Sequence, residues 1–386
     1  MNTTAGKALQ KEADMHFKIE RDIFLKALQK VQGIVEKRTS MPILSNILLE
    51  AAGDAIEVTA TDLEVGLKGR YPAKVERDGK ITVGAKKLYE IVKELPNEEI
   101  AFTAKDNDWV EIICGKVRFN IVGLPSDEFP AVAVVKDEQL LELEAALLRR
   151  MIEKTSYAIC NDETKYNLNG IFTRVEQTDA GQVLKMVATD GHRLSIAAGA
   201  FTGQANPELL KGVILPKKGI YEIKKITDEG DGLLQFGFVN ASAVIRKGDT
   251  TLVMRLVDGE FPDYTRVIPA ANDQIVKARR EALIHAVRRM AILSSEKFKG
   301  IMLEIENNGI KISSSNPELG DAMEELDVTF EGAPFSVRFN ARYLLDVLMV
   351  CESEQVQMKF RNELSPSIVT PDSDDDLLAV IMPMRL

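Results

Sequence analysis

Hydrophobic positions along the chain follow two spacings that alternate in a recurring order. Apolar residues recur three or four positions apart over 21–35 and 85–95, which predicts two helices with one buried face each. Between these helices, short alternating or continuous apolar runs predict strands over 47–51, 55–61 and 67–71. The first segment of the chain therefore combines helices with strands.

The same order of helices and strands begins again twice. Further helices are predicted over 144–157, 217–226, 279–293 and 341–351, again with strand-like runs between them. A helix and a sheet each bury one face, so such units predict an α+β fold with antiparallel sheets. We expect three repeated domains with two helices each, over 15–138, 139–270 and 271–386, after an aperiodic, disordered extension over 1–14.

A short motif marks the middle repeat. The run from Val187 to Ser195 joins the end of an apolar strand to a turn at Asp190 and Gly191, where glycine permits positive φ and aspartate caps its own backbone. A weaker copy begins at Ala60, and a fainter one at Ser314. A Phe-Pro pair likewise recurs, at 129–130 and 261–262. These copies support an internal repeat.

Composition places the chain among ordinary globular proteins. Its 386 residues are 45% hydrophobic and 28% charged, enough for two or three domains. No apolar run reaches the ~18 residues that a membrane helix needs, and no secretory signal precedes the first strand. The three cysteines, Cys114, Cys160 and Cys351, are far apart, which argues against disulfides and zinc. We expect a reduced, cytoplasmic protein without a membrane partner.

Charge is distributed unevenly along the chain. The net charge of −10 alone argues against a nucleic-acid partner, but binding depends on where charges lie. Each predicted helix carries basic residues: Lys26, Lys30, Lys86, Lys87, Lys93, Arg149, Arg150, Lys154, Lys217, Lys218, Lys224, Lys225, Lys277, Arg288, Arg289 and Arg342. Such residues can simply solvate an outer helix face. The same bias in six helices favours a shared electropositive surface.

No catalytic site is predicted. Asp190, His192 and Ser195 are the residue types of a hydrolase, but the run has no nucleophile elbow, so turn and pocket chemistry is the better interpretation. The histidines His16, His192 and His285 are too scattered for a metal site. We expect no cofactor.

Several segments in the same order resemble one family. They are Arg38–Leu44, Tyr166–Gly170, the Ala-Thr-Asp-Gly-His-Arg-Leu run, Phe261–Tyr264 and the C-terminal Met-Pro-Met-Arg-Leu. Together they resemble the bacterial sliding clamps, the beta subunits of DNA polymerase III. The resemblance covers residues 15–386.

The resemblance implies a non-catalytic processivity factor of replication. It would be a ring-shaped homodimer that encircles duplex DNA, slides without base readout, and tethers the polymerase III alpha subunit, the clamp loader, other polymerases and repair proteins. Simple geometry agrees, since helices pack ~8–10 Å apart and twelve in a circle leave a bore of roughly 30–38 Å. Six helices would leave less than ~20 Å, too narrow for a duplex.

The resemblance also implies a partner-peptide groove between the second and third domains. Methionine and aliphatic side chains suit it because they adapt to several extended peptides. We expect Arg193 and Arg266 at its rim, and a partner Leu or Phe between Leu194, Val267 and Met382. The implied groove residues are Leu168, Thr189, Gly191, His192, Arg193, Leu194, Pro262, Arg266, Val267, Leu364, Pro366, Val380, Ile381, Met382, Pro383, Met384, Arg385 and Leu386.

Two further surfaces are expected. By resemblance, DNA phosphates would meet Arg38 and Tyr166, with Lys165, Arg149 and Arg150 nearby. Charge patterning predicts the ring seam, because one edge of the third unit is acidic while the first unit carries basic residues. We expect strands over 116–122 and 323–329 to pair between subunits. The seam residues are Lys87, Arg118, Ile121, Ile292, Leu293, Glu318, Asp321 and Glu324.

Two alternatives from other classes stay open at this stage. A DNA-modifying enzyme would need a metal or nucleophile cluster, which the sequence does not offer. A non-replicative DNA-associated scaffold would not need a closed ring, and a monomeric mass in solution would favour it.

Overall fold

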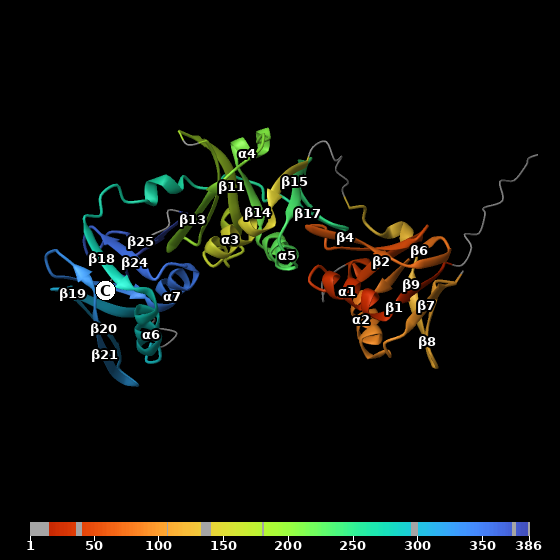
Figure 1. Cartoon of the computed structure of the whole chain (residues 1–386). Helices are drawn as coiled ribbons and strands as arrows, with labels where there is room; N and C mark the ends of the chain where they lie inside the picture. Colours follow the sequence, from red (N-terminus) through yellow and green to blue (C-terminus); the bar gives the residue numbers. More distant parts are fainter. Residues whose placement is uncertain are drawn as a thin grey trace, which may run out of the picture. The chain divides into compact units, whose positions relative to one another are not determined.

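The described residues form two compact units of helices and antiparallel strands (Figure 1). The computed structural model describes residues 15–35, 41–105, 107–132, 140–179, 181–294, 300–372 and 376–384. One unit is drawn from Met1–Glu142 and Leu234–Arg255, and the other from Leu143–Leu233 and Leu256–Leu386. The α+β class is confirmed. The predicted extension over 1–14 lies outside the described residues.

The helices agree closely with the hydrophobic pattern. They are α1 (Arg21–Val31), α2 (Ala85–Glu94), α3 (Ala145–Ser156), α4 (Pro207–Lys211), α5 (Lys217–Asp228), α6 (Arg280–Ala291) and α7 (Ala341–Val350). The prediction that the first helix continues to residue 35 is wrong: it ends at Val31, and the turn that follows contains Gly33, a poor helix former. The short helix α4 was not predicted, although Asn206 caps it and Pro207 begins it. Among the described residues, no helix is long and apolar enough to cross a membrane.

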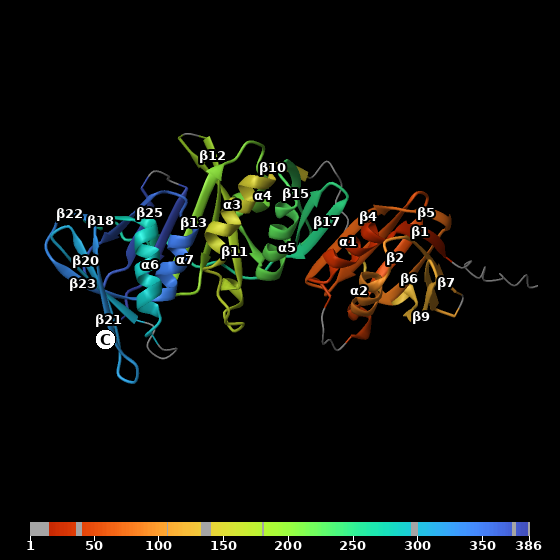
Figure 2. The same ribbon diagram turned by 60° about the horizontal axis from the view of Figure 1, so that its bottom comes forward.

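The first compact unit is built on one thirteen-stranded sheet. In spatial order its strands are β10 (Leu140–Glu144), β15 (Leu233–Val239), β16 (Ser242–Lys247), β17 (Thr250–Arg255), β4 (Val65–Pro72), β3 (Ala55–Thr61), β2 (Asn46–Ala52), β6 (Gly79–Gly84), β9 (Val117–Leu124), β8 (Trp109–Cys114), β7 (Glu99–Ala104), β1 (His16–Glu20) and β5 (Lys74–Arg77). Helices α1 and α2 lie side by side against this sheet (Figure 2). Phe24 of α1 meets Phe17 and Phe102 of the sheet edge-on at 6.1 and 6.2 Å between ring centroids. These rings are fully buried, so they anchor the core.

Strands far apart in sequence complete this sheet. Strand β17 pairs with β4 over five residue pairs, with Leu252 opposite Leu67. The pairing joins a strand of the middle of the chain to the first repeat. As a result, the compact unit contains residues that the sequence repeat assigns to the second domain, and the predicted domain boundaries stay a prediction.

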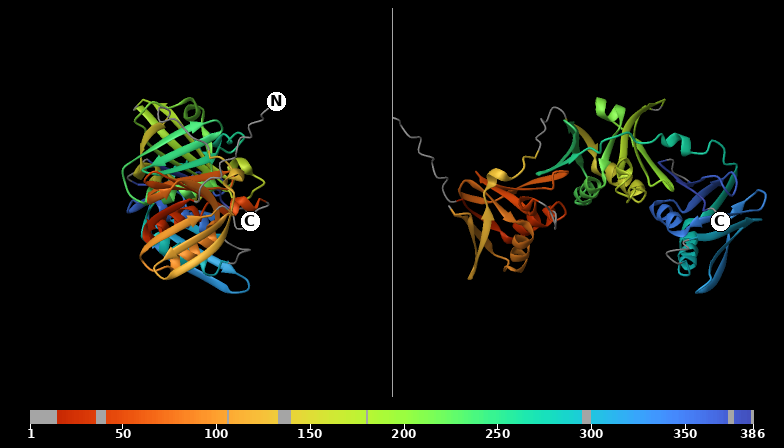
Figure 3. Two further views of the ribbon diagram at one scale, coloured as in Figure 1. Left: turned by 90° about the vertical axis from the view of Figure 1, so that its right-hand side faces the viewer. Right: turned by 180° about the vertical axis from the view of Figure 1, so that it is seen from behind.

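The second compact unit contains two sheets. The nine-stranded sheet has the order β14 (Val213–Pro216), β11 (Gly170–Thr178), β12 (Gly181–Thr189), β13 (Arg193–Ala200), β26 (Leu377–Ile381), β25 (Ser367–Pro371), β24 (Gln355–Phe360), β18 (Gln274–Arg279) and β22 (Thr329–Phe330). The four-stranded sheet has the order β21 (Gly320–Asp327), β20 (Gly309–Asn316), β19 (Gly300–Glu306) and β23 (Phe335–Asn340). Helices α3 and α5 form one pair and α6 and α7 another (Figures 1 and 2). Behind them, an extended segment carries the 3-10 helix η5 (Tyr264–Val267) toward β18 (Figure 3, right).

One basic helix residue is buried, against expectation. Lys154 of α3 is 2% exposed, and its ammonium donates to both carboxylate oxygens of Asp376 at 2.6 and 2.7 Å. The backbone carbonyl of Lys154 also accepts a hydrogen bond from the Ser195 hydroxyl at 2.5 Å. The helical pattern predicts that this lysine faces solvent. The pattern cannot reveal its partner Asp376, which lies 222 residues away in the sequence. It supports the packing of α3 and does not belong to an open basic face.

Candidate functional site

The corner between β12 and β13 is fixed by its own polar side chains. Asp190 accepts hydrogen bonds from the backbone amides of His192 and Arg193 at 2.9 and 3.1 Å, and Gly191 has a φ of 91°. The Thr189 hydroxyl donates to the Arg193 carbonyl at 2.6 Å. The aspartate–glycine turn that the sequence predicted is therefore present, and it exposes Gly191 and His192 while burying Arg193.

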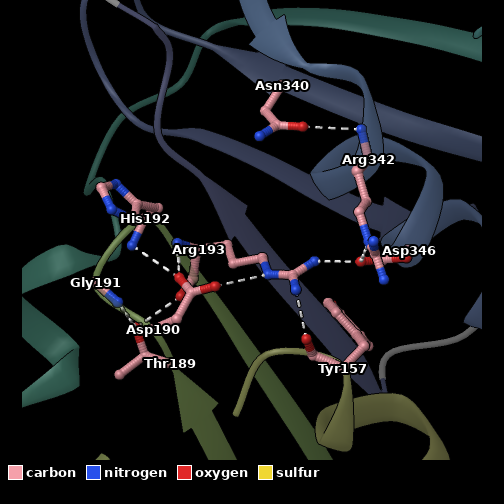
Figure 4. A network of polar contacts seen from close by, with 9 residues as sticks. All are labelled: Tyr157, Thr189, Asp190, Gly191, His192, Arg193, Asn340, Arg342 and Asp346. Atoms are coloured by element: carbon pink, nitrogen blue, oxygen red, sulfur yellow. Dashed lines mark hydrogen bonds and ion pairs between the residues drawn. The ribbon is translucent and has the colours of Figure 1, made fainter. Parts of the chain in front are cut away.

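A buried arginine ties this corner to a distant helix (Figure 4). The guanidinium of Arg193 donates to Asp190 at 3.1 Å, to Asp346 of α7 at 2.6 Å and to the backbone carbonyl of Tyr157 at 2.5 Å. Only 9% of the arginine side chain is exposed, and the two carboxylates are 15% and 16% exposed. Arg193 is thus occupied inside the structure. The expectation that it offers its charge at the rim of the groove is wrong.

Aromatic rings complete the surroundings of this cation. The guanidinium carbon of Arg193 lies 4.5 Å from the ring centroid of Tyr343 and 5.2 Å from that of Tyr157. Tyr343 also stacks on the exposed His192 with 6.3 Å between centroids. Sequence reasoning missed these tyrosines and Asp346. A buried arginine demands a carboxylate, but no local pattern identifies one that is 153 residues away.

Three separate segments meet beside the corner. Residues Phe261 and Tyr264 pack with Ile368 and Val380 in one apolar cluster, which includes Leu194. The amide of Met382 donates to the His192 carbonyl at 2.9 Å, so the C-terminal tail runs along the corner. The predicted groove residues of the corner, the η5 segment and the tail therefore lie together in the second compact unit.

The predicted groove residues differ strongly in exposure. Leu194, Val380 and Ile381 are buried, at 2% exposure or less, so they support the surface from beneath. Val267 and Met382 are 41% and 38% exposed. The exposed members of the set are Gly191, His192, Pro262, Arg266, Val267, Leu364, Met382 and Met384. Leu168, Thr189, Pro366 and Pro383 are half-buried, and Arg385 and Leu386 lie outside the described residues.

Two contacts extend this surface on either side. Arg266 is largely exposed, and its Nε donates to Asp263 at 2.9 Å, so one cation does stand at the surface. On the other side, the Asn167 side chain donates to the Glu260 carbonyl at 3.0 Å and holds the 3-10 helix η4 (Tyr166–Leu168) beside the η5 segment. The exposed apolar side chains of Val267 and Met382 thus sit among polar neighbours, which suits an interaction surface.

The residues expected to meet DNA fall into three groups. Tyr166 is 61% exposed and Lys165 and Arg150 are exposed too, so these side chains are accessible. Arg149 is held, since its guanidinium donates to Asp231 at 2.8 Å and to the Thr227 carbonyl at 2.7 Å. Arg38 lies outside the described residues.

Many other basic helix residues already have acidic partners. Lys224 of α5 donates to Glu153 of α3 at 2.6 Å, and Lys225 donates to Glu222 at the same distance. The hydrogen bond that Lys224 donates to Glu153, with further contributions from Asp228, raises the pKa of Lys224. Such pairs reduce the positive charge that α3 and α5 offer to a phosphate. The exposed Arg150 is consequently a stronger candidate than these paired residues for a contact with a DNA phosphate.

The residues expected at the ring seam lie at two open strand edges. Within the part of the chain that the structure describes, β21 ends its sheet, and Val117–Val122 of β9 pairs only with β8. Apolar side chains are exposed near both edges, including Phe119 at 37%, Met323 at 57% and Ile292 at 75%. Ile121 and Leu293 are half-buried, and Arg118, Glu318 and Asp321 are exposed.

Two of the seam residues already form ion pairs within the chain. Glu324 accepts from Arg289 of α6, a hydrogen bond that lowers the pKa of this carboxyl, and Lys87 bonds Glu90 at 2.7 Å. Among the described residues, no cluster of three or more His, Cys, Asp or Glu side chains could hold a metal ion.

Comparison with known proteins identifies this arrangement. Three family models of the DNA polymerase III beta subunit match in succession: the N-terminal domain over residues 15–133, the central domain over 142–263 and the C-terminal domain over 265–385. The beta sliding clamp of Pseudomonas putida is 39% identical over 373 residues, which cover 96% of this chain and all of the relative. That of Escherichia coli K12 is 36% identical, with the same coverage of both chains.

Solved structures agree over the same length. The crystal structure of the Caulobacter crescentus beta sliding clamp superposes with a TM-score of 0.92 at 36% identity and covers 97% of this chain and all of the other. The Pseudomonas aeruginosa DNA polymerase III beta subunit gives 0.88 at 38% identity, covering 96% of this chain and all of that one.

The three repeated α+β domains are those of a DNA sliding clamp. The chain belongs to the DNA polymerase III beta subunit family, the beta sliding clamps, as its sequence motifs indicated. It is a processivity factor of DNA replication, and the comparisons do not favour the non-replicative scaffold.

The ion pair between Arg193 and Asp346 should stabilise the contact between the β12–β13 corner and α7. We expect Asp346→Asn to lower the free energy of unfolding by about 1.5–3 kcal/mol, because it removes a charged partner from a buried guanidinium. In a double-mutant cycle with Arg193→Met, urea titrations should give a coupling of at least ~1 kcal/mol. Arg342→Ala is the control, since Arg342 is exposed and 3.9 Å from the same carboxylate, and it should cost under ~1 kcal/mol. Additive effects of the two buried substitutions would contradict a direct pair.

Proposed function

We propose that two copies of this chain close into a ring around duplex DNA and act there without catalysis, as a mobile tether. The open edges of β9 and β21 carry the proposal, because an exposed strand edge with apolar side chains is prone to pair with another chain. Antiparallel pairing of these edges between two copies would continue the sheets from one subunit into the next. The predicted seam strands, 116–122 and 323–329, overlap both edges.

The contacts with DNA would be electrostatic and independent of sequence. Arg150, Lys165, Tyr166 and, by family resemblance, Arg38 are the proposed contacts, with a lesser part for the occupied Arg149. Phosphate contacts carry no sequence information, and such electrostatic binding allows a protein to slide along the duplex. Such a protein would remain on DNA because the closed ring encloses the duplex.

The surface at the β12–β13 corner would take partner peptides. Val267 and Met382 offer adaptable apolar contact, and His192 and Arg266 offer polar contact at the edge. The proposed partners are the polymerase III alpha subunit, the clamp loader, other polymerases and repair proteins. A related sliding clamp from Bartonella birtlesii has been solved with griselimycin bound, which supports ligand capture by this class of protein.

Retention on closed DNA tests the proposal as a whole. Protein loaded on a nicked circular plasmid should co-elute with it in gel filtration, and should be lost when one restriction cut makes the plasmid linear. Arg150→Ala should flatten the salt dependence of DNA binding by close to one phosphate contact, a slope change of ~0.9. Arg149→Ala should have a smaller effect because Asp231 already holds that guanidinium. Equal retention on circular and linear plasmid would refute the ring.

The seam should depend more on apolar burial than on ion pairs. Ile292→Ala with Leu293→Ala should weaken the dimer more than Glu318→Ala, since a buried aliphatic side chain contributes ~1.5–3 kcal/mol and an exposed ion pair under ~1. Analytical ultracentrifugation of each variant gives the dimer dissociation constant. Ile275→Ala is the matched control, because Ile275 is 42% exposed on β18, a strand of the nine-stranded sheet, which contains neither β9 nor β21. The account fails if Glu318→Ala weakens the dimer most.

The C-terminal tail should be necessary for peptide binding. Deleting Pro383–Leu386 removes the hydrogen bond of 2.8 Å that the Met384 amide donates to the Arg338 carbonyl. The deletion should abolish binding of a fluorescein-labelled peptide rich in Leu and Phe. Met382→Ala should weaken binding about tenfold, the loss that ~1.4 kcal/mol of apolar contact produces. Met349→Ala is the control, since Met349 is an exposed methionine of α7. Anisotropy titrations that show unchanged affinity for the truncated protein would remove the tail from the site.

A further inference from the structure

A cavity of about 590 Å³ lies in the first compact unit, far in sequence from the β12–β13 corner. Its floor is one row of residues across five strands, each paired with the next: Leu48, Thr59, Lys68, Thr251 and Arg246. Its opposite wall is the segment over 126–132, which contains the first Phe-Pro pair. The volume is within the range of small-ligand and side-chain pockets, roughly 300–1,000 Å³.

The second compact unit contains the corresponding row, and there it is closed. Phe172, Val187, Ile196 and Leu378 are paired across β11, β12, β13 and β26 in the same register. The two rows correspond because Thr59 and Val187 each stand two positions before the threonine of the repeated motif. Over this second row lies the other Phe-Pro segment.

Aromatic side chains close the second row. Phe261 stacks on Phe172 at 5.1 Å between ring centroids, and Tyr264 lies 6.5 Å from Phe261. These rings and the row beneath them belong to one apolar cluster. The fold therefore does not require a cavity at this position.

At every position compared, the first row has a smaller or more polar side chain than the second row. The first row has Leu48 at the position of Phe172 in the second row, and Thr59 at the position of Val187. It has Lys68 at the position of Ile196 and Thr251 at the position of Leu378. In the covering segment, Val132 stands where the second row has Tyr264, and its methyls pack against Gly66. Of the polar residues in this floor only Thr59 is buried, so the rest of the floor is accessible to a ligand.

The polar groups of the cavity fit one type of ligand. The floor offers hydrogen-bond donors from Thr59, Lys68, Thr251 and Arg246, and Lys80 adds a third cation. The Lys68 ammonium is also paired with Glu57, so a ligand would share this cation with that carboxylate. Phe129, Pro130, Ala131 and Val132 supply an apolar wall. Glu50 and Asp127 also line the cavity, so they would repel a second negative charge.

We propose that this cavity is a second binding site, for an apolar group that carries a single carboxylate. The carboxylate would lie over the Lys68–Thr251–Arg246 part of the row, and the apolar group would rest against the Phe129–Val132 wall. The same chemistry is offered by a free aromatic acid and by an aspartate beside a phenylalanine in a partner peptide. The site is distinct from the β12–β13 corner and does not depend on the function proposed for it.

Methyl NMR of the full-length protein can read both sites at once. The Leu48 and Val132 methyls report on the cavity, and the Met382 methyl reports on the corner. The free-acid probes are 3-phenylpropionate and its neutral amide, and the peptide probes are N-acetyl-Phe-Asp-amide and N-acetyl-Phe-Asn-amide. We expect titrations of the cavity methyls to give the two acids dissociation constants at least about tenfold lower than those of their amides. A charge-assisted contact worth ~1.4 kcal/mol is enough for this difference.

Two variants locate the binding. Leu48→Phe with Thr251→Leu introduces the side chains that close the second row, and should abolish the acid-induced shift at Val132. Unchanged methyl signals of the buried Leu28 and Val92 verify that the first compact unit is folded. Lys80→Gln should weaken binding about threefold, whereas Lys74→Gln, which removes a lysine outside the cavity, should not.

The outcomes separate the two sources from failure of the proposal. Tighter binding of the aspartyl peptide than of 3-phenylpropionate assigns the site to partner peptides, and the reverse order assigns it to free acids. Absence of shifts at Leu48 and Val132, equal shifts from acids and amides, or binding that survives the filled variant would each overturn the proposal. Shifts confined to Met382 would leave the β12–β13 corner as the binding site and refute the cavity.

Discussion

The pairing of strand edges is the constraint on which the rest of this molecule depends. A sheet edge exposes unpaired amides and carbonyls, and each repeat of this chain produces such an edge. Strand β17 covers β4, and β26 covers β13, in both cases through five residue pairs. Within the described residues the edges at β9 and β21 remain open, and these are where a second copy of the chain would be needed.

The β13–β26 pairing also helps to hold the β12–β13 corner in place. Main-chain pairing sets the register of the two strands, and the buried Arg193 then fixes the corner against α7 through Asp346. A buried ion pair is weak evidence of stability, because desolvation opposes its attraction. Its value here is geometric, since one guanidinium satisfies two carboxylates and a backbone carbonyl. The exposed Met382 follows β26 directly, and its amide bonds the His192 carbonyl of the same corner at 2.9 Å.

Periodicity and motif order were enough to predict the fold, because both are local properties. The helices of three repeats, the turn at Asp190 and the family itself were all accessible from the sequence. What could not be predicted depends on pairs that are distant in the chain. Lys154 was expected in solvent because Asp376 could not be foreseen, and Arg193 was expected at the rim because its partners Asp346 and Tyr343 are carried by α7. The cavity over Lys68 was missed for a related reason, since only the strand register shows which residues of the two repeats correspond.

The interleaving of strands between repeats has a consequence for how such a protein can evolve. The first compact unit takes Leu234–Arg255 from the middle of the chain, so it cannot be inherited as one continuous segment. A recombination event at a repeat boundary would separate β4 from the strand that evolved beside it, and would do the same to β13 and β26. A substitution in β4 or β13 that alters either pairing must therefore also fit a strand of the neighbouring repeat.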